Sequence, residues 1–382
     1  STAATATYGH ISNWNVSNVT NMEELFKDKS SFNENIGGWD VSNVTDMAAV
    51  FQNATSFNQD ISGWNVSKVT RMTNMFRNTP FNQNISSWDV SSVTGMASMF
   101  RNADDFNQPL NNWDVSNVIE MHYMFWYAQS FNQSLNNWNV SNVVDMDKMF
   151  INAESYNQSL NDWNVSSVTN MTEMFKNATA FNQPLNTWNV SSVEDMSSMF
   201  SSATTFDKDL DSWNVSSVKD MKYMFQSASA FNRPIGSWNI SNVTKTQDMF
   251  VNASSFNQDI SGWDVSNVTY MSFMFSNTPF NNGGSTGINN WNVSSVTTLW
   301  GMFKNATSFN QDISGWDVSS VTTIRELFYN ATSFNQDISS WDVSAVSDFH
   351  NYGEGASSHE LPDPESGANF QDSLDTYFDV FS

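Results

Sequence analysis

The amino-acid sequence predicts a repeat solenoid, one domain of about thirteen stacked coils with about 25 residues in each. Tryptophan recurs along the 382 residues, and all of its repeat intervals are 25 residues except one of 24 and one of 28. A fixed period in this range is typical of solenoids, whose units bury their apolar sides against neighbouring units. The repeat tryptophans are Trp14, Trp39, Trp64, Trp88, Trp113, Trp138, Trp163, Trp188, Trp213, Trp238, Trp263, Trp291, Trp316 and Trp341.

The order of apolar residues in the first half of each repeat predicts a short strand. Ile61, Trp64, Val66 and Val69 follow the pattern apolar-x-x-apolar-x-apolar-x-x-apolar, which matches the first half of a leucine-rich repeat. We therefore expect a short parallel strand that points the Trp and Val side chains inward and Asn65 outward. The Asn or Asp that follows each repeat Trp should accordingly line the outer face.

The second half of each repeat changes its period. Met72, Met75 and Phe76 are spaced i, i+3 and i+4, which predicts one short helix or 3₁₀ turn in an LRR-like coil. Asn78 follows, at a place where a residue that tolerates the left-handed conformation would end such a turn.

A polar column accompanies the aromatic core. An Asn stands after nearly every repeat Phe, and Asp207 is the exception. We expect these side chains to form an amide ladder that satisfies backbone groups where no strand pairing exists. The column contains Asn33, Asn58, Asn82, Asn107, Asn132, Asn157, Asn182, Asn232, Asn257, Asn281, Asn310 and Asn335.

The repeat motif points to a family. The run W-D-V-S-N-V-T-x-M-x-x-M-F, seen at residues 263–275 and with a Val for the second Met at 39–51, resembles the BspA-like leucine-rich-repeat surface proteins with mycoplasma-lipoprotein-type repeats. The resemblance covers residues 11–349. It implies an extracellular or cell-surface structural or adhesive protein without shared catalytic residues, and a glycan-binding adhesin module is the alternative. The chain lacks a lipid-anchor Cys and a recognisable sorting domain.

Composition narrows the function classes further. The net charge is −24, from 39 acidic and 15 basic residues, which argues against binding to nucleic acid or to an anionic membrane. No apolar run approaches the roughly 20 residues needed to span a membrane, and the absence of Cys excludes disulfides. No clustered acid–base set departs from the repeat, so we do not expect an enzyme. A start at Ser1 is consistent with secretion and removal of a leader.

One coil carries aromatic residues where other coils have small or polar ones. These residues are His122, Tyr123, Trp126 and Tyr127, and Trp300 occupies the same column as His122. Such residues could stack on sugar rings or contact a host surface protein, and lateral packing is the alternative. The Asx column after each Trp is a second candidate glycan surface.

The repeat also suggests candidate sites for one modification, N-glycosylation, and for one ligand, calcium. The N-A-[ST] sequons follow the turn on the outer edge and are candidate N-glycosylation sites: Asn53, Asn177, Asn252, Asn305 and Asn330. We predict no cofactor, with calcium between stacked Asp side chains as the alternative. The Asp column, which contains Asp60, Asp259, Asp312 and Asp337, also contains Pro109, Pro184 and Pro234, so a continuous ion ladder is excluded.

The two ends of the repeat array differ. Residues 1–10 are expected to be extended, with too little apolar surface to cover Trp14, Val16, Met22 and Phe26 of the first coil. Residues 350–382 are acidic, and the spacing of Phe370, Leu374, Tyr377, Phe378 and Phe381 predicts a capping helix. A covered end and an open end predict a homopolymer that forms through head-to-tail contact of solenoid ends.

Overall fold

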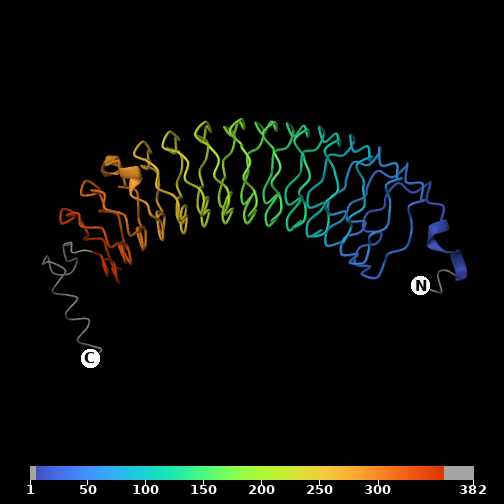
Figure 1. The fold of residues 1–382 in the computed structure, drawn as a ribbon. Coiled ribbons are helices and arrows are strands. Elements are labelled where there is room, and N and C mark those ends of the chain that lie inside the picture. The colour runs from blue at the N-terminus through green and yellow to red at the C-terminus, as the bar shows by residue number, and fades with distance from the viewer. Residues whose placement is uncertain (1–5, 357–382) are drawn as a thin grey trace, which may run out of the picture. The chain divides into compact units, whose positions relative to one another are not determined.

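The computed structural model describes residues 6–356, which belong to two compact units, residues 1–192 and 193–382. Each unit is a stack of coils, so the solenoid prediction is confirmed for each (Figure 1). The named elements in the described range are three short 3₁₀ helices, η1 (Ile11–Asn13), η2 (Asn282–Gly284) and η3 (Gly287–Asn290). η2 and η3 contain the insertion that lengthens one repeat interval to 28 residues.

The prediction of a short strand in each coil is wrong. Neighbouring coils pair through isolated parallel bridges of one residue each, such as Arg71 with Gly95, and no strand is described in any coil. The chain turns before each bridge, because Trp64 N–H donates to the Ile61 carbonyl at 3.1 Å and Val69 N–H donates to the Val66 carbonyl at 2.9 Å. An extended stretch long enough for a ladder therefore does not form.

The expected helix is also replaced by turns. Met75 N–H donates to the Met72 carbonyl at 3.1 Å, and Asn74 has a φ of 58°, as in a β-turn with one left-handed residue. Alternate N–H groups leave the coil, since Met72 and Asn74 donate to carbonyls of Gly95 and Ala97 in the next coil. A helix would keep those donors within its own turns. The turn run ends at Asn78, whose φ of 57° confirms the expected left-handed residue.

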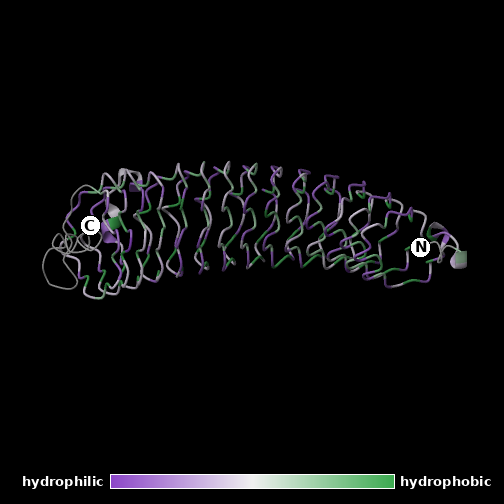
Figure 2. Ribbon diagram, turned by 90° about the horizontal axis from the view of Figure 1, so that it is seen from below, coloured by the Kyte–Doolittle hydropathy of each residue, from purple (hydrophilic) through white to green (hydrophobic). Residues whose placement is uncertain are grey.

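The predicted core columns are correct. Met72, Met75 and Phe76 are fully buried, and the ring of Phe76 stacks on that of Phe100 in the next coil with centroids 5.7 Å apart. Hydrophobic and hydrophilic residues alternate along each coil (Figure 2). Inner Trp residues also donate the indole N–H to a carbonyl of the preceding coil, as Trp64 does to Ile36 at 3.1 Å, whereas the buried Nε1 of Trp291 has no partner. Periodic burial thus determines which side chains face inward, whatever turn type connects them.

The predicted amide ladder is present. Asn58 Oδ1 accepts from the backbone N–H of Asn82 at 3.0 Å and from Gln83 Nε2 at 2.9 Å. Where Asp207 replaces Asn, Arg233 replaces Gln and donates from Nε and Nη2 at 2.9 and 2.7 Å. The Asx column after each Trp faces solvent as expected. Its side chains close Asx-turns, in which the Asx oxygen accepts from the Ser N–H two residues later.

The ends differ from the expectation. Residues 6–8 are helical rather than extended, and η1 follows them. Met22 and Phe26 of the first coil are buried, because the Phe32 ring stacks on Phe26 at 3.9 Å; Val16 is buried as well, while Trp14 stays 38% exposed. Coil pairing also continues beyond residue 349, since Asn330 N–H donates to the Glu354 carbonyl at 2.7 Å. The predicted helix over residues 370–381 lies outside the described residues.

Candidate binding surface

The first unit brings four of the five predicted aromatic residues together. The His122 and Tyr123 rings meet edge to face at 5.1 Å, and the Tyr123 and Trp126 rings lie 5.3 Å apart. Tyr127 stacks beside Trp126 at 6.1 Å with an interplanar angle of 26°. Tyr127 is 41% exposed, whereas the other three side chains are half-buried. We call residues 122–127 the aromatic cluster.

The turn geometry explains how two tyrosines enter this cluster. Tyr123 and Tyr127 have φ values of 61° and 59°, so they occupy the two left-handed positions that Asn74 and Asn78 occupy two coils earlier. A bulky residue at positive φ is uncommon and carries a conformational cost, because its Cβ crowds the backbone. The left-handed conformation itself is common to the coils, since Tyr223 and Phe273 adopt it at the same repeat position as Tyr123.

Cations hold the aromatic rings in place. The Arg101 guanidinium lies 3.8 Å from the Trp126 ring centroid and 5.8 Å from that of Tyr123. Lys148 Nζ lies 5.4 Å from the Tyr123 centroid and 3.1 Å from the Asp147 carboxylate. Burial raises the pKa of Tyr123, and a hydrogen bond with Asp147 raises it further. Desolvation likewise raises the pKa of Asp147.

Tyr127 interrupts a second amide ladder, which the sequence reasoning missed. At the last left-handed position of several coils, an Asn Nδ2 donates to the Asn Oδ1 of the preceding coil, as Asn102 does to Asn78 at 2.7 Å and Asn177 to Asn152 at 2.6 Å. Tyr127 occupies the position between Asn102 and Asn152. The aromatic ring therefore replaces a hydrogen-bonding amide with an exposed apolar face.

Trp300 is not part of the aromatic cluster, because it belongs to the second unit. Its ring lies 5.1 Å from Phe273 and 5.5 Å from the Arg325 guanidinium, and it is 39% exposed. Gly301 follows it at a φ of 57°, and a Cβ there would overlap the Phe273 ring. The second unit thus holds a smaller aromatic and cationic group of its own.

The candidate glycosylation sites mostly serve the second amide ladder. Asn53, Asn177, Asn305 and Asn330 each donate Nδ2 to the Asn or Asp of the preceding coil. Asn252 differs, since it is exposed and its Nδ2 makes no hydrogen bond to a described residue. The preceding coil has Ser227 at the ladder position, and its shorter side chain offers no amide oxygen.

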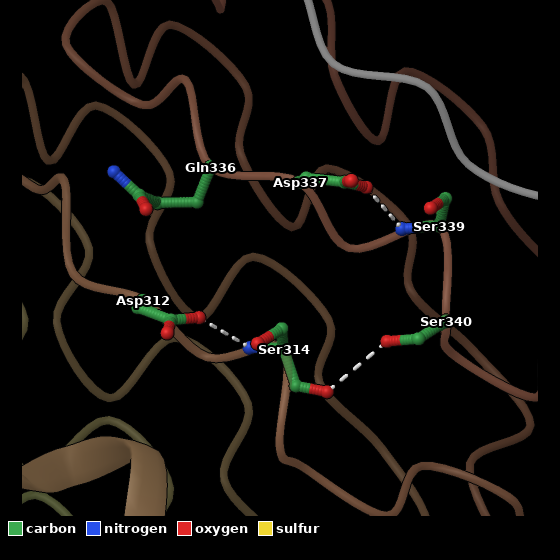
Figure 3. A pocket seen from close by; sticks show the side chains of 6 residues that line it. All are labelled: Asp312, Ser314, Gln336, Asp337, Ser339 and Ser340. Atoms are coloured by element: carbon green, nitrogen blue, oxygen red, sulfur yellow. Dashed lines mark hydrogen bonds between the residues drawn. The ribbon is translucent and has the colours of Figure 1, made fainter.

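The Asp column forms Asx-turns of its own. Asp312 and Asp337 line a shallow depression of about 310 Å³ with Ser314 and Ser339 (Figure 3). Each carboxylate accepts from the Ser N–H two residues later at 2.9 Å, and the bonds from Ser339 lower the pKa of Asp337. Residues 6–356 contain no group of three or more His, Cys, Asp or Glu placed to hold a metal ion. Nor does that range contain a helix long and apolar enough to cross a membrane.

These features define a repeat protein of leucine-rich-repeat-like, solenoid type. The family described as "Mycoplasma protein of unknown function, DUF285" matches residues 1–110, 63–158, 133–233, 181–286 and 280–362, so the chain belongs to this family. The predicted resemblance to mycoplasma-type repeats is thereby confirmed. No curated protein matches the sequence.

Two solved structures are similar to the chain over much of its length. One is an internalin (InlF) from Listeria monocytogenes, with 11% identity, 78% of this chain and 80% of that chain covered, and a TM-score of 0.22. The other is a TLR13–ssRNA13 complex, with 10% identity, 87% of this chain and 55% of that chain covered, and a TM-score of 0.21.

Proposed function

We propose that the chain is an extracellular, BspA-like repeat protein with an adhesive role, and that the aromatic cluster binds carbohydrate. The observation that carries this proposal is the local departure from the repeat at residues 122–127. At the Tyr127 position most other coils hold an Asn, and ladder amides such as Asn102 and Asn152 serve the fold there. Tyr127 gives up that role and presents an aromatic face to solvent.

Preorganisation supports a binding role for this surface. Arg101 covers Trp126, and Tyr123 bonds to Asp147, so few rotamers remain to be ordered when a ligand binds. Rigid aromatic residues with a polar rim are typical of binding hot spots. Aromatic faces stack on the apolar faces of sugar rings, which makes carbohydrate the best-matched ligand. A host surface protein is the alternative partner, and we propose no catalytic role.

A glycan array tests this function. Wild-type protein should bind a subset of saccharides, and Trp126→Ala should lose most of that signal, because it removes a ring that contacts both the Arg101 guanidinium and the Tyr127 ring. Trp300→Ala is the matched control, since it truncates an exposed Trp of the second unit. Thermal unfolding of all three proteins would separate lost binding from lost fold. Failure of the wild type to bind any saccharide would contradict the proposal.

A second candidate function is head-to-tail assembly into a surface fibre. In the turn run after each bridge, alternate N–H groups donate to carbonyls of the next coil, as Met22 does to Asp46 at 2.9 Å. The first coil consequently has a row of carbonyls that accept from no described residue: those of Asn21, Glu23, Leu25 and Lys27. In the last described coil, the N–H groups of Asn351 and Gly353 donate to no residue in the described range.

These two rows have complementary hydrogen-bonding groups, as required for a heterologous contact between two copies. Sedimentation velocity over a range of protein concentrations tests the assembly. Wild-type protein should form a series of larger species, and deletion of residues 1–10 should weaken it by disturbing the first coil. A protein that remains monomeric at high concentration would exclude the fibre while leaving carbohydrate binding intact.

A further inference from the structure

We infer that the aromatic cluster selects saccharides that carry an acid group, and that Arg77 and Arg101 bind that group. The inference rests on the proposed carbohydrate binding and specifies its ligand class. Arg77 and Arg101 occupy the same position in successive coils, and Trp126 follows them at that position in the next coil. The acid group would thus lie beside the aromatic cluster that contacts the sugar ring.

Arg77 and Arg101 are among the minority of cations in the described residues that form no ion pair. With 39 acidic and 15 basic residues, most cations in the structure find a carboxylate, as Arg71 does with Asp46 at 2.6 Å and Arg233 with Asp207 at 2.7 Å. The side chains of Arg77 and Arg101, by contrast, form no ion pair or hydrogen bond with a described residue. Their Nε atoms, like that of Arg325 in the second unit, are buried and have no partner. A buried donor without a partner carries a desolvation cost that a bound anion would remove.

The two guanidinium groups also repel each other. Burial lowers the pKa of Arg101, and the positive charge of Arg77 lowers it further. Like charges at close range destabilise the free protein, and an anion between them converts that repulsion into attraction. The pair therefore favours a ligand with localised negative charge.

The stacking on Trp126 leaves Arg101 able to bind an anion in its own plane. The indole covers the face of the guanidinium at 3.8 Å, so the terminal N–H groups at its edge, which have no partner among the described residues, can reach an anion. A planar guanidinium donates two parallel hydrogen bonds to a carboxylate or sulfate. Tyr127 follows Trp126 in the sequence, and the centroids of the two rings lie 6.1 Å apart. Tyr127 offers the exposed ring for the sugar. The net charge of −24 disfavours long polyanions, which favours a saccharide with few acid groups.

Isothermal titration calorimetry with three matched tetrasaccharides tests the inference. The probes are a neutral glucan, the same glycan with one uronate residue, and the same glycan with one sulfate. The acidic probes should bind at least about tenfold more tightly than the neutral one, because hydrogen bonds between a guanidinium and an acid group are roughly twice as strong as those between neutral groups. The two acidic probes distinguish carboxylate from sulfate as the preferred group, and a preference for either supports the inference.

Variants assign the effect to residues. Arg77→Gln and Arg101→Gln should each reduce the acid preference, and Arg101→Lys should restore it only in part, because it keeps the charge but not the planar fork. Lys176→Gln is the matched control, since Lys176 lies in the same column but pairs with Glu173 at 3.1 Å. Equal binding of neutral and acidic probes, unchanged in the Arg variants, would overturn the inference and leave carbohydrate binding standing. Binding of none of the saccharides would overturn both.

Discussion

The amide ladder beside the Phe column makes a measurable prediction for Asn132. Its Oδ1 accepts from the Asn157 backbone N–H and from Gln158 Nε2, both at 3.0 Å in half-buried surroundings. Asn132→Ala would leave both donors without a protein partner. An unsatisfied buried donor costs about 1–3 kcal/mol, and partial access to water places each donor at the lower end, so we expect a loss of about 2–3 kcal/mol.

Urea unfolding and hydrogen exchange measure this loss. The first urea transition should move to lower denaturant by about 1 M, given a slope of about 1–3 kcal/mol/M. The Asn157 amide should also exchange faster, because stability in a repeat stack is largely local. Asn132→Asp keeps the acceptor oxygen and should lose less. Combined with Gln158→Arg, it recreates the natural pair of Asp207 and Arg233 and should approach wild-type stability.

The ladder account would be refuted by an Asn132→Ala protein whose urea midpoint and Asn157 exchange rate match the wild type. That result would mean that water satisfies these donors as well as the amide does.

Three further predictions concern stability. Gly301→Ala should lower the unfolding temperature by an amount equivalent to about 2 kcal/mol, because the new methyl group overlaps the Phe273 ring, and Phe273→Ala should restore part of the loss. Asp248→Asn should stabilise the protein more at pH 8 than at pH 5, since desolvation raises the pKa of Asp248 to about 6. Above that pH the folded protein has to hold the carboxylate in its ionised form, which the partly buried site disfavours, and the substitution removes this cost. Melting temperatures at both pH values measure the difference. Bonds from Ser319 lower the pKa of Asp317 below 3.8, so such Asx-turns stabilise above that pH and lose their contribution as the pH falls through the folded-state pKa, which an acid titration of unfolding would follow.

Each of these has a contradicting outcome. An unchanged melting temperature in Gly301→Ala would show that Phe273 moves freely. An Asp248→Asn effect of equal size at both pH values would reflect its left-handed backbone, at a φ of 56°, instead of its charge. Stability that is constant from pH 5 to pH 2 would mean that the Asx-turn carboxylates are not needed in ionised form.

The core could be predicted well because burial depends on the spacing of apolar side chains, and this spacing recurs with each of the fourteen repeat Trp residues. It did not predict the backbone of the second half-coil, since a spacing of i, i+3, i+4 fits consecutive β-turns as well as a helix. The left-handed position at Asn78 was expected, but the earlier one in each coil was not, because it holds residues as different as Asn74, Tyr123 and Lys148 instead of Gly. Alternate N–H groups in this half-coil donate to a neighbouring coil. These hydrogen bonds therefore depend on how the coils stack, which the spacing within one repeat does not reveal.

The candidate site could be predicted in part. The aromatic residues at 122–127 stood out as departures from their columns, and the structure does bring them together. The Arg pair was missed, although its signal was present. Arg77 and Arg101 precede Trp126 at the same repeat position in an acidic chain, and reading columns for charge as well as for aromatic residues would have found them. That neither Arg pairs with a carboxylate could be learned only from the structure.

Tyr127→Asn tests the central claim, that this coil departs from the repeat in order to bind a ligand. The substitution restores the ladder amide between Asn102 and Asn152, so the unfolding temperature should stay the same or rise. Saccharide affinity, measured by calorimetry on the same preparation, should fall at least about tenfold, because the exposed ring is lost. Stability and binding would then change in opposite directions. A variant that binds saccharide as tightly as the wild type would contradict the claim.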